Sequence, residues 1–343
     1  MPFDNIDQRM KRYERATKER TLKLNKLVQA YRLAFPTRAK WLVSGEGSMS
    51  LDKTRYRWDN TAVQGLKTFS SNIQSLLMPP FQQWASLKPG PNLEGMEAQA
   101  LEVAIQESSR VIFRALELSN LMLEVNISFQ DMGIAVGLLQ IRSCEDESRP
   151  VEFKSIPMHK VALGEYMGKI VDVYRELKVP VRDIKSMWPD ADLTESMKTL
   201  LDSSPGEEVE LLEGTIYYPQ NKIEERYHYF VMDMSERKDV VTRKQKMSRW
   251  IPFRFAVSPG EVWGEGPVLQ VLDAIRIANK IVEMDLLNAG FKISRPLFVN
   301  TNQILNPNNL KMEPGAIIRT NSTNPNDLPV AAFDYASDFK DGS

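Results

Sequence analysis

Residues that could perform acid–base, metal or nucleophilic chemistry are few in this sequence, and their spacing groups none of them. The 343 residues include two histidines, His159 and His228, and one cysteine, Cys144. A zinc site needs closely spaced His and Cys ligands, and neither an HxxxH nor a CxxC spacing occurs. A Ser-His-Asp triad stays open, but the GxSxG turn that presents a serine nucleophile in one hydrolase class is absent. The sequence motifs therefore give little support to an enzymatic function.

Two weaker patterns could still carry chemistry. The run GEYMGKI at residues 164–170 is the nearest approach to a phosphate-binding loop, but its glycine spacing is wrong and it lacks the Ser or Thr that would hold Mg²⁺. We interpret it as a turn before a strand. The acidic residues are scattered, so a two-metal site would have to gather distant ones such as Asp131, Asp172 and Asp273. A solvated surface is the simpler interpretation of these acids.

The composition is that of a mixed globular chain. Its length exceeds the ~100–200 residues of a typical domain, so we expect two or three substructures. The 44 Lys and Arg balance 45 Asp and Glu, whereas chains that hold nucleic acid by counterion release are strongly basic. One cysteine cannot form an intrachain disulfide, which indicates a reducing compartment. We expect a soluble protein made in the cytosol, since we find neither an apolar run of the ~20 residues that span a bilayer nor a signal peptide.

Residues 1–137 have the period of long helices. Apolar side chains recur every three to four positions over residues 5–33, 52–78, 94–118 and 120–133. Pro36 and the pair Pro79-Pro80 end the first two helices. A short strand is expected at residues 84–87. The basic excess of the first 25 residues is modest, and we interpret it as a solvated helix face in preference to a nucleic-acid arm.

Residues 138–257 change to the two-residue period of strands. Alternation predicts strands at residues 151–156, 170–175, 209–218, 226–232 and 250–255, with a helix near residues 181–188. The basic run at residues 238–246 is interpreted as an exposed hairpin tip.

The last part of the chain holds the clearest pattern. A Gly- and Pro-rich turn at residues 258–267 precedes a stretch without Gly or Pro up to Gly290, which predicts a helix of about 23 residues and ~34 Å. Positions seven apart place an apolar stripe with a central polar residue on this helix, which suits packing against another helix in a fixed register. An ordinary buried helix explains the pattern equally well. The stripe consists of Val268, Leu272, Ile275, Asn279, Val282 and Leu286.

Four stretches carry a family resemblance through their order. The first, at residues 24–41, contains LNKL and YRLAFP, and the second, at residues 51–87, contains LDKT, MPP and WASL. The third, at residues 118–137, contains LSN and DMG, and the fourth, at residues 252–317, contains PFR, PGEVWGEGP, RPLFV and PGAI. In this order, the stretches resemble the portal, or head-to-tail connector, proteins of short-tailed bacteriophages.

The resemblance implies an α+β fold of three parts. A wing of helices and antiparallel strands takes residues 1–257, helical over 1–137 and β-rich over 138–257. A long stem helix takes residues 258–291, and a small α/β clip takes residues 292–320. A second stem helix and a crown usually follow the clip in such proteins but are absent from this chain. The polar residues 321–343 are therefore expected to lead into a missing second stem helix.

The implied function is structural. About twelve copies would form a ring at one capsid vertex, through which double-stranded DNA is packaged and later ejected. Such proteins have no catalytic residues, metal or cofactor of their own. Their partners would be the terminase large subunit, the capsid protein and tail adaptor proteins, with no membrane insertion. The protein would reside in the virion after assembly in the host cytoplasm. Near-neutral charge fits this function, because a strongly basic channel would trap the duplex.

The resemblance also suggests roles for single residues. The apolar stripe would pack against the neighbouring copy of the stem helix. Charged residues on the opposite face would line the channel or form interchain ion pairs, and basic residues of the clip would dock the motor or an adaptor. Plain solvent exposure is the simpler interpretation of each charged residue. The first set is Asp273, Arg276, Lys280 and Glu283, and the second is Arg295, Lys311 and Arg319.

Two other functions stay open. A metal-dependent nucleic-acid-processing enzyme predicts DNA cleavage or ATP turnover by the purified chain. A non-channel scaffold or adaptor of the virion predicts a monomer that binds partners through the stripe.

Overall fold

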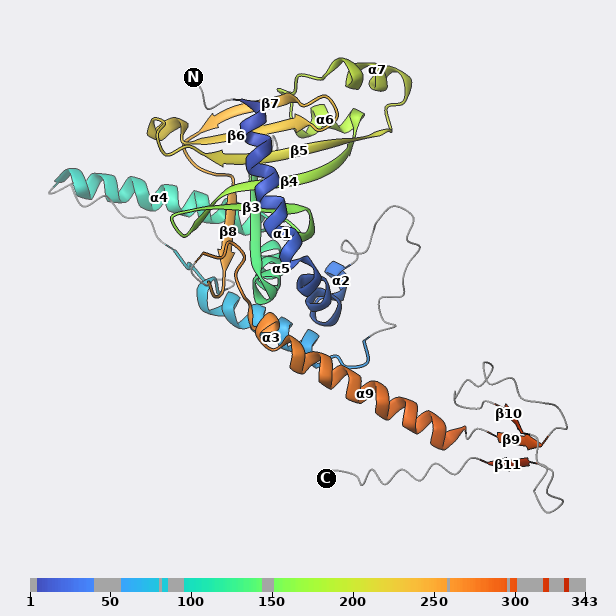
Figure 1. The fold of residues 1–343 in the computed structure, drawn as a ribbon. Helices are drawn as coiled ribbons and strands as arrows, with labels where there is room; N and C mark the ends of the chain where they lie inside the picture. The colour runs from blue at the N-terminus through green and yellow to red at the C-terminus, as the bar shows by residue number, and fades with distance from the viewer. Residues whose placement is uncertain are drawn as a thin grey trace. The chain divides into compact units, whose positions relative to one another are not determined.

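The computed structural model describes residues 5–39, 57–79, 82–85, 96–143, 151–257, 260–294, 297–300, 317–320 and 330–332. The chain forms two compact units: unit 1 comprises residues 1–53 and 60–272, and unit 2 comprises residues 54–59 and 273–343. Helices and largely antiparallel strands come in separate runs along the chain, so the fold is α+β, as the resemblance implied (Figure 1).

Helix α1 (Ile6–Ala34) begins and ends where its sequence dictates. The side chain of Asn5 caps the first turn, since its Oδ1 accepts a hydrogen bond from the backbone N–H of Asp7 at 3.1 Å. The helix ends at Phe35, because Pro36 disfavours a helical conformation in the residue before it. The short helix α2 (Pro36–Ala39) follows.

The central element of unit 1 is a five-stranded antiparallel sheet in which the strands pair in chain order. Side chains alternate between its two faces. Phe230 and Met232 pack beneath Tyr13 and Ala16 of α1, whereas Val231 lies in the hydrophobic cluster of the opposite face. The strands are β3 (Val161–Tyr166), β4 (Lys169–Pro180), β5 (Glu208–Tyr217), β6 (Tyr227–Asp233) and β7 (Lys238–Gln245).

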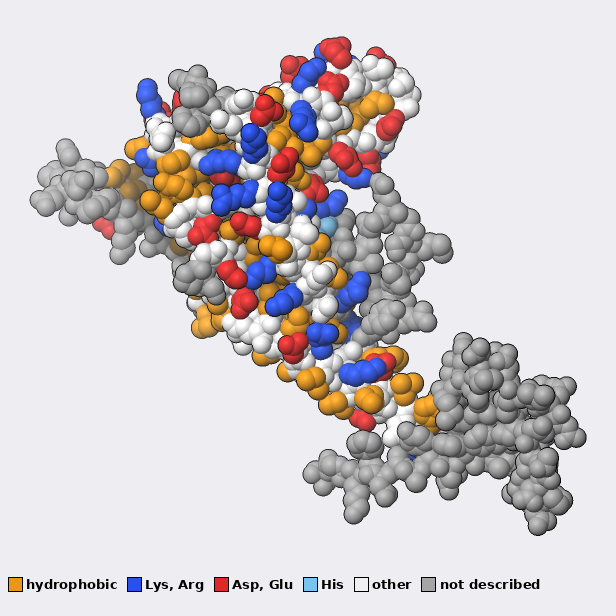
Figure 2. Space-filling model, viewed as in Figure 1, with side chains coloured by type: hydrophobic (Ala, Val, Ile, Leu, Met, Phe, Trp, Pro, Cys, Tyr) orange, Lys and Arg blue, Asp and Glu red, His pale blue; other side chains and the backbone are white. Residues whose placement is uncertain are grey.

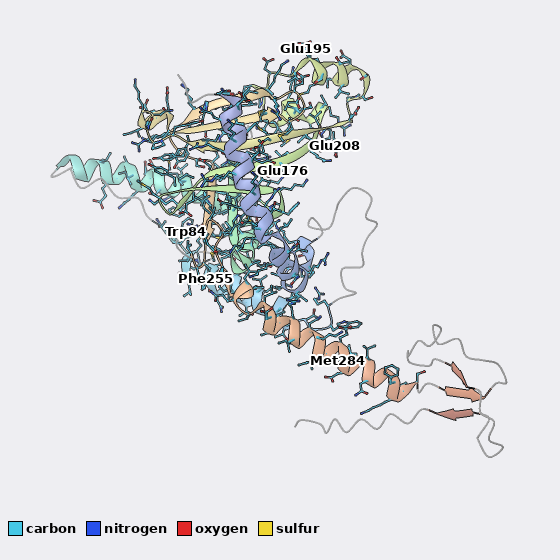
Figure 3. All side chains as sticks on the ribbon, in the orientation of Figure 1. Trp84, Glu176, Glu195, Glu208, Phe255 and Met284 are labelled. Carbon is cyan, nitrogen blue, oxygen red and sulfur yellow. The ribbon has the colours of Figure 1, made fainter. Side chains whose placement is uncertain are left out.

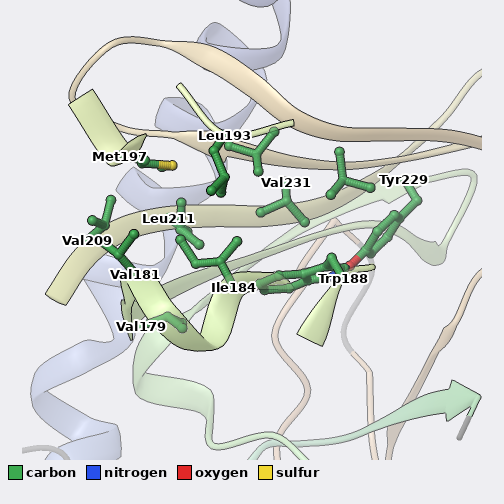
Figure 4. Packing of buried hydrophobic residues seen from close by; sticks show 12 residues of the cluster. Val179, Val181, Ile184, Trp188, Leu193, Met197, Val209, Leu211, Tyr229 and Val231 are labelled. Atoms are coloured by element: carbon green, nitrogen blue, oxygen red, sulfur yellow. The ribbon is translucent and has the colours of Figure 1, made fainter. Parts of the chain in front are cut away.

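Helices α6 (Val181–Met187) and α7 (Glu195–Ser203) pack on that opposite face of the sheet. Ile184 and Met197 are fully buried there, and Figure 4 shows them converging on the strand residues. Trp188 donates a hydrogen bond from Nε1 to the hydroxyl of Tyr229 at 2.7 Å, and that hydroxyl donates to Glu213 at 2.9 Å. The indole and phenol are thereby buried without unsatisfied polar atoms.

A second core joins the helices to a three-stranded sheet of order β2-β1-β8. Helix α5 (Leu121–Ile134) packs on this sheet, and helix α3 (Thr61–Leu77) packs on α5. The longer α4 (Met96–Leu118) precedes α5. The strands are β1 (Val136–Ser143), β2 (Val151–Ser155) and β8 (Trp250–Arg254). Two short 3₁₀ turns, Met158–Lys160 and Ile223–Glu225, also lie in unit 1.

Several local predictions are confirmed and several are wrong. The GEYMGKI run is a two-residue hairpin turn between β3 and β4, with positive φ angles at Met167 and Gly168, and it is no phosphate loop. The basic run at residues 238–246 is strand β7, not a hairpin tip. Trp84 and Ala85 form no strand, and the helix expected from residue 52 begins at Thr61. Residues 40–56 and 86–95 lie outside the described residues.

The long C-terminal helix is present but interrupted. Helix α8 (Pro267–Gln270) is separated from α9 (Leu272–Ile293) by Val271, whose ψ of 17° departs from the helical value. In unit 2, strand β9 (Leu297–Asn300) pairs in parallel with β10 (Ile317–Thr320) and antiparallel with β11 (Val330–Ala332).

Candidate assembly surface on helix α9

The approach to the long helix is fixed to unit 1 by the GEVWGEGP turn. The backbone N–H of Gly266 donates to the carbonyl of Ile134, at the end of α5, at 2.9 Å. A Cβ at position 266 would lie only 2.2 Å from the carbonyl oxygen of Gly133, so only glycine permits this approach. Val268 of α8 is buried against α1 and α5.

The predicted apolar stripe therefore divides into two parts. Val268 and Leu272 are 6% exposed and lie in the core of unit 1, so they are unavailable to a neighbouring chain. Ile275 and Val282 are half-buried, and Leu286 is 52% exposed. Only the part of the stripe from residue 275 onward presents a surface to solvent.

Helix α9 carries a second apolar stripe that the sequence reasoning missed. Ile277, Ile281 and Met284 are 62%, 53% and 59% exposed, and their spacing of four and three places them on one side of the helix. Figure 3 labels Met284 on this helix. Two residues apart, a helix turns by about 200°, so Met284 and Leu286 point to nearly opposite sides. The i, i+4, i+7 spacing of these three residues is visible in the sequence.

The four predicted charged residues lie between the two stripes and pair within the helix. Arg276 Nη1 contacts Asp273 Oδ1 at 3.3 Å, and Lys280 Nζ contacts Glu283 Oε2 at 3.0 Å. Both pairs have i, i+3 spacing and lie largely in solvent, so they contribute little to stability. They leave this strip of α9 electrically balanced.

Asn279 has an intrachain role that the stripe did not suggest. Its Oδ1 accepts hydrogen bonds from the backbone N–H groups of Trp58 and Asp59 at 2.7 and 3.1 Å. The segment at residues 57–59 thus lies on α9 within unit 2. Ile275 and Val282, on the same side of the helix as Asn279, are half-buried.

Of the three predicted docking residues of the clip, one lies among the described residues. Arg319 lies in strand β10, whose backbone alone is described. Arg295 and Lys311 lie outside the described residues. Their proposed docking role stays a prediction.

The acids of the enzyme alternative do not form one site. Asp131 is fully buried and pairs with Arg38 at 3.0 Å, Asp172 pairs with Arg12 at 3.6 Å, and Asp273 lies in unit 2. Burial raises the pKa of both Asp131 and Asp172, and the neighbouring guanidinium groups offset only part of this effect. Each carboxylate thus has its own cation within the fold.

The part of the chain that the structure describes contains neither a metal-binding cluster nor a membrane-spanning helix. No three His, Cys, Asp or Glu side chains among them lie close enough together to bind one metal ion. No described helix combines the length and the apolar character needed to cross a membrane.

Similarity to known proteins identifies the family of the chain. None of the curated proteins matches the chain. The model of one family, described as the bacteriophage head to tail connecting protein, matches residues 7–337. Because this match spans nearly the whole chain and accompanies the α+β fold expected of a connector, the chain belongs to the bacteriophage head to tail connecting protein family.

Proposed function

We propose that copies of this connector protein form a closed ring whose opening passes double-stranded DNA during genome packaging and ejection. Membership of the family makes the chain a structural component of the virion at the junction of head and tail. The ring, its about twelve subunits and the channel are the proposal. The observation that carries it is the exposure of apolar side chains on two nearly opposite sides of α9, the stripe of Ile277, Ile281 and Met284 on one side and Leu286 on the other.

Two stripes on nearly opposite sides of one helix call for two neighbours. A helix that packs against a single partner needs one apolar stripe, and the other face is normally polar. On α9, Met284 and Leu286 are both more than half exposed, yet they face different directions. A contact between two different surfaces repeats from copy to copy and closes into a ring if the rotation permits.

The charge of α9 suits a surface near moving DNA. The pairs Asp273–Arg276 and Lys280–Glu283 balance each other's charge within the helix, so this strip offers DNA no excess of cations. A protein that neutralises many phosphates binds DNA tightly and in a salt-dependent manner. We propose that these four residues line the channel or the contacts between stem helices.

The remaining partners follow from the family. We propose that the clip, residues 292–320, docks the terminase motor or a tail adaptor through Arg295, Lys311 and Arg319. The capsid protein would contact unit 1.

The test compares assembly of the full chain with that of three variants. Met284→Asp and Leu286→Asp each place a charge on one stripe, and we expect each to lower the ring fraction by about tenfold or more. Leu286 serves this purpose better than Leu272, whose burial would couple the substitution to folding. Ile223→Asp is the matched control, since Ile223 is 59% exposed and lies on unit 1.

Mass photometry and negative-stain images supply the readout. The unaltered chain should form annular particles of about twelve times the mass of one chain, with an opening wider than the ~20 Å duplex. A monomer at high concentration would favour the scaffold or adaptor alternative. Rings of normal mass from both stripe variants would show that α9 is not the contact.

A further inference from the structure

The solvent side of α1 carries a row of exposed cations. Lys11, Arg15, Lys18 and Lys26 are all exposed, fall on one side of the helix, and form no ion pair or hydrogen bond among the described residues. The row spans about 22 Å at 1.5 Å per residue. Leu22, which is 83% exposed, lies in the middle of it. We call these five residues the basic stripe.

Three other cations of α1 are paired with the protein's own acids. Arg9 pairs with Asp239 at 2.6 Å, Arg20 with Glu176 at 2.9 Å, and Lys23 with Glu261 at 2.8 Å. Helix α1 therefore matches its inward-facing cations with carboxylates but leaves the basic stripe unmatched. Leu22 adds exposed apolar area to this stripe, and contact of an apolar side chain with water is unfavourable.

A second surface of unit 1 has the opposite charge. Residues 189–210, which contain α7 and the turns on either side, hold seven acidic residues and the single base Lys198, a net charge of −6. Every residue from 202 to 208 is exposed. Asp202, Glu207 and Glu208 form no ion pair within the described residues. We call residues 189–210 the acidic lobe.

The two surfaces are separate on the molecule. Figure 2 shows acidic side chains gathered over the end of unit 1 that carries α7, and Lys and Arg side chains along α1. Figure 3 places Glu195 and Glu208 at that acidic end. The whole chain has a net charge of only −1. The positive charge of the basic stripe and the negative charge of the acidic lobe are therefore local features of two different surfaces.

We infer that the basic stripe of one copy docks on the acidic lobe of the next copy. This inference rests on the proposed ring, because only a contact between two different surfaces brings opposite charges together at every junction. Complementary surface charge speeds correct encounter and disfavours wrong pairing, which a closed ring needs at each step. Leu22 supplies the apolar centre of the contact.

Charge reversal on either side provides the test. The first variant is Lys11→Glu/Arg15→Glu/Lys18→Glu, and the second is Asp202→Lys/Glu207→Lys/Glu208→Lys. Each alone sets like charges against each other at every junction, so we expect the ring fraction of the full chain to fall at least about tenfold. Mixed in equal amounts, the two variants should restore rings, because alternating copies again pair opposite charges. The matched control reverses three exposed lysines elsewhere, Lys67, Lys222 and Lys246.

The outcomes separate this contact from the ring itself. Rescue by mixing supports the contact and also shows that both variants fold. Rings from either variant alone, or loss without rescue, would overturn the contact while the ring of the unaltered chain stands. A first variant that forms normal rings but no longer binds a short DNA duplex would assign the stripe to nucleic acid and overturn the proposal. If the unaltered chain forms no rings, the proposed function fails first.

Discussion

Replacing Gly266 with alanine tests whether α8 is seated on α5 as closely as the structure shows. The added Cβ would lie 2.2 Å from the carbonyl oxygen of Gly133 and 2.6 Å from that of Met132. Ordinary contacts of this kind begin at 3.4 Å. Both obstacles are backbone atoms, so no side chain can rotate away, and α8 must retreat by about 1 Å.

The cost of that retreat has two parts. Overpacking against backbone costs about 1–3 kcal/mol. The retreat also breaks the hydrogen bond from Gly266 N–H to the carbonyl of Ile134, which contributes about 1 kcal/mol. Gly266→Ala should therefore lower the free energy of unfolding of unit 1 by about 2–4 kcal/mol. Val268, 6% exposed, would become accessible in the process.

Urea unfolding followed by tryptophan fluorescence measures this loss, because Trp263 is buried beside the turn. Gly65→Ala is the matched control. Gly65 lies inside α3 with no atom within 4 Å of the added Cβ, so this substitution should stabilise the protein by up to about 1 kcal/mol. A Gly266→Ala variant within about 0.5 kcal/mol of the unaltered protein would refute the close approach.

Two further predictions concern unit 1. Burial, together with the charges of Lys160, Arg38 and Arg20, lowers the pKa of His159 to about 4, whereas the unfolded imidazole titrates near 6.5. As pH falls from 6.5 to 4 the unfolded state binds the proton first, so this group removes up to about 3 kcal/mol of stability. His159→Gln should lack this loss in urea unfolding at pH 7.5 and 4.5, and parallel pH profiles would contradict the assignment. Trp188→Phe removes the hydrogen bond to the buried Tyr229 hydroxyl and should cost about 1–2 kcal/mol, and Tyr229→Phe in the same background should then cost less than it does alone.

The fold was predictable where local patterns agree with tertiary packing. Residues 5–33 read as a helix because their apolar period and Pro36 both act within the segment, and α1 confirms it. Strand β7 was misread because its charged residues suggest a solvated tip, whereas Val240 and Val241 are buried. An edge strand can carry many charges when only part of it faces the core.

The candidate site was predictable only in part. The helix and its charged residues follow from the sequence, but the break at Val271 involves neither Gly nor Pro and arises where α8 is fixed to α1 and α5. The burial of Val268 and Leu272 depends on the same packing. Asn279 looked like a register-setting residue, yet its partners at Trp58 and Asp59 lie about 220 positions earlier in the chain. No local pattern reports such a distant pair.

The bond between Asn279 and the Trp58 backbone also sets an order of events during synthesis. Residues 57–59 are synthesised roughly 10–45 s before Asn279, which accepts their hydrogen bonds, at a rate of about 5–20 residues per second. During that interval unit 1 can begin to fold around its own sheet, whereas residues 57–59 lack their partner in unit 2. The second unit is thus completed last, after translation delivers α9 and the strands that follow it. Incomplete chains lack the finished helix through which copies would join.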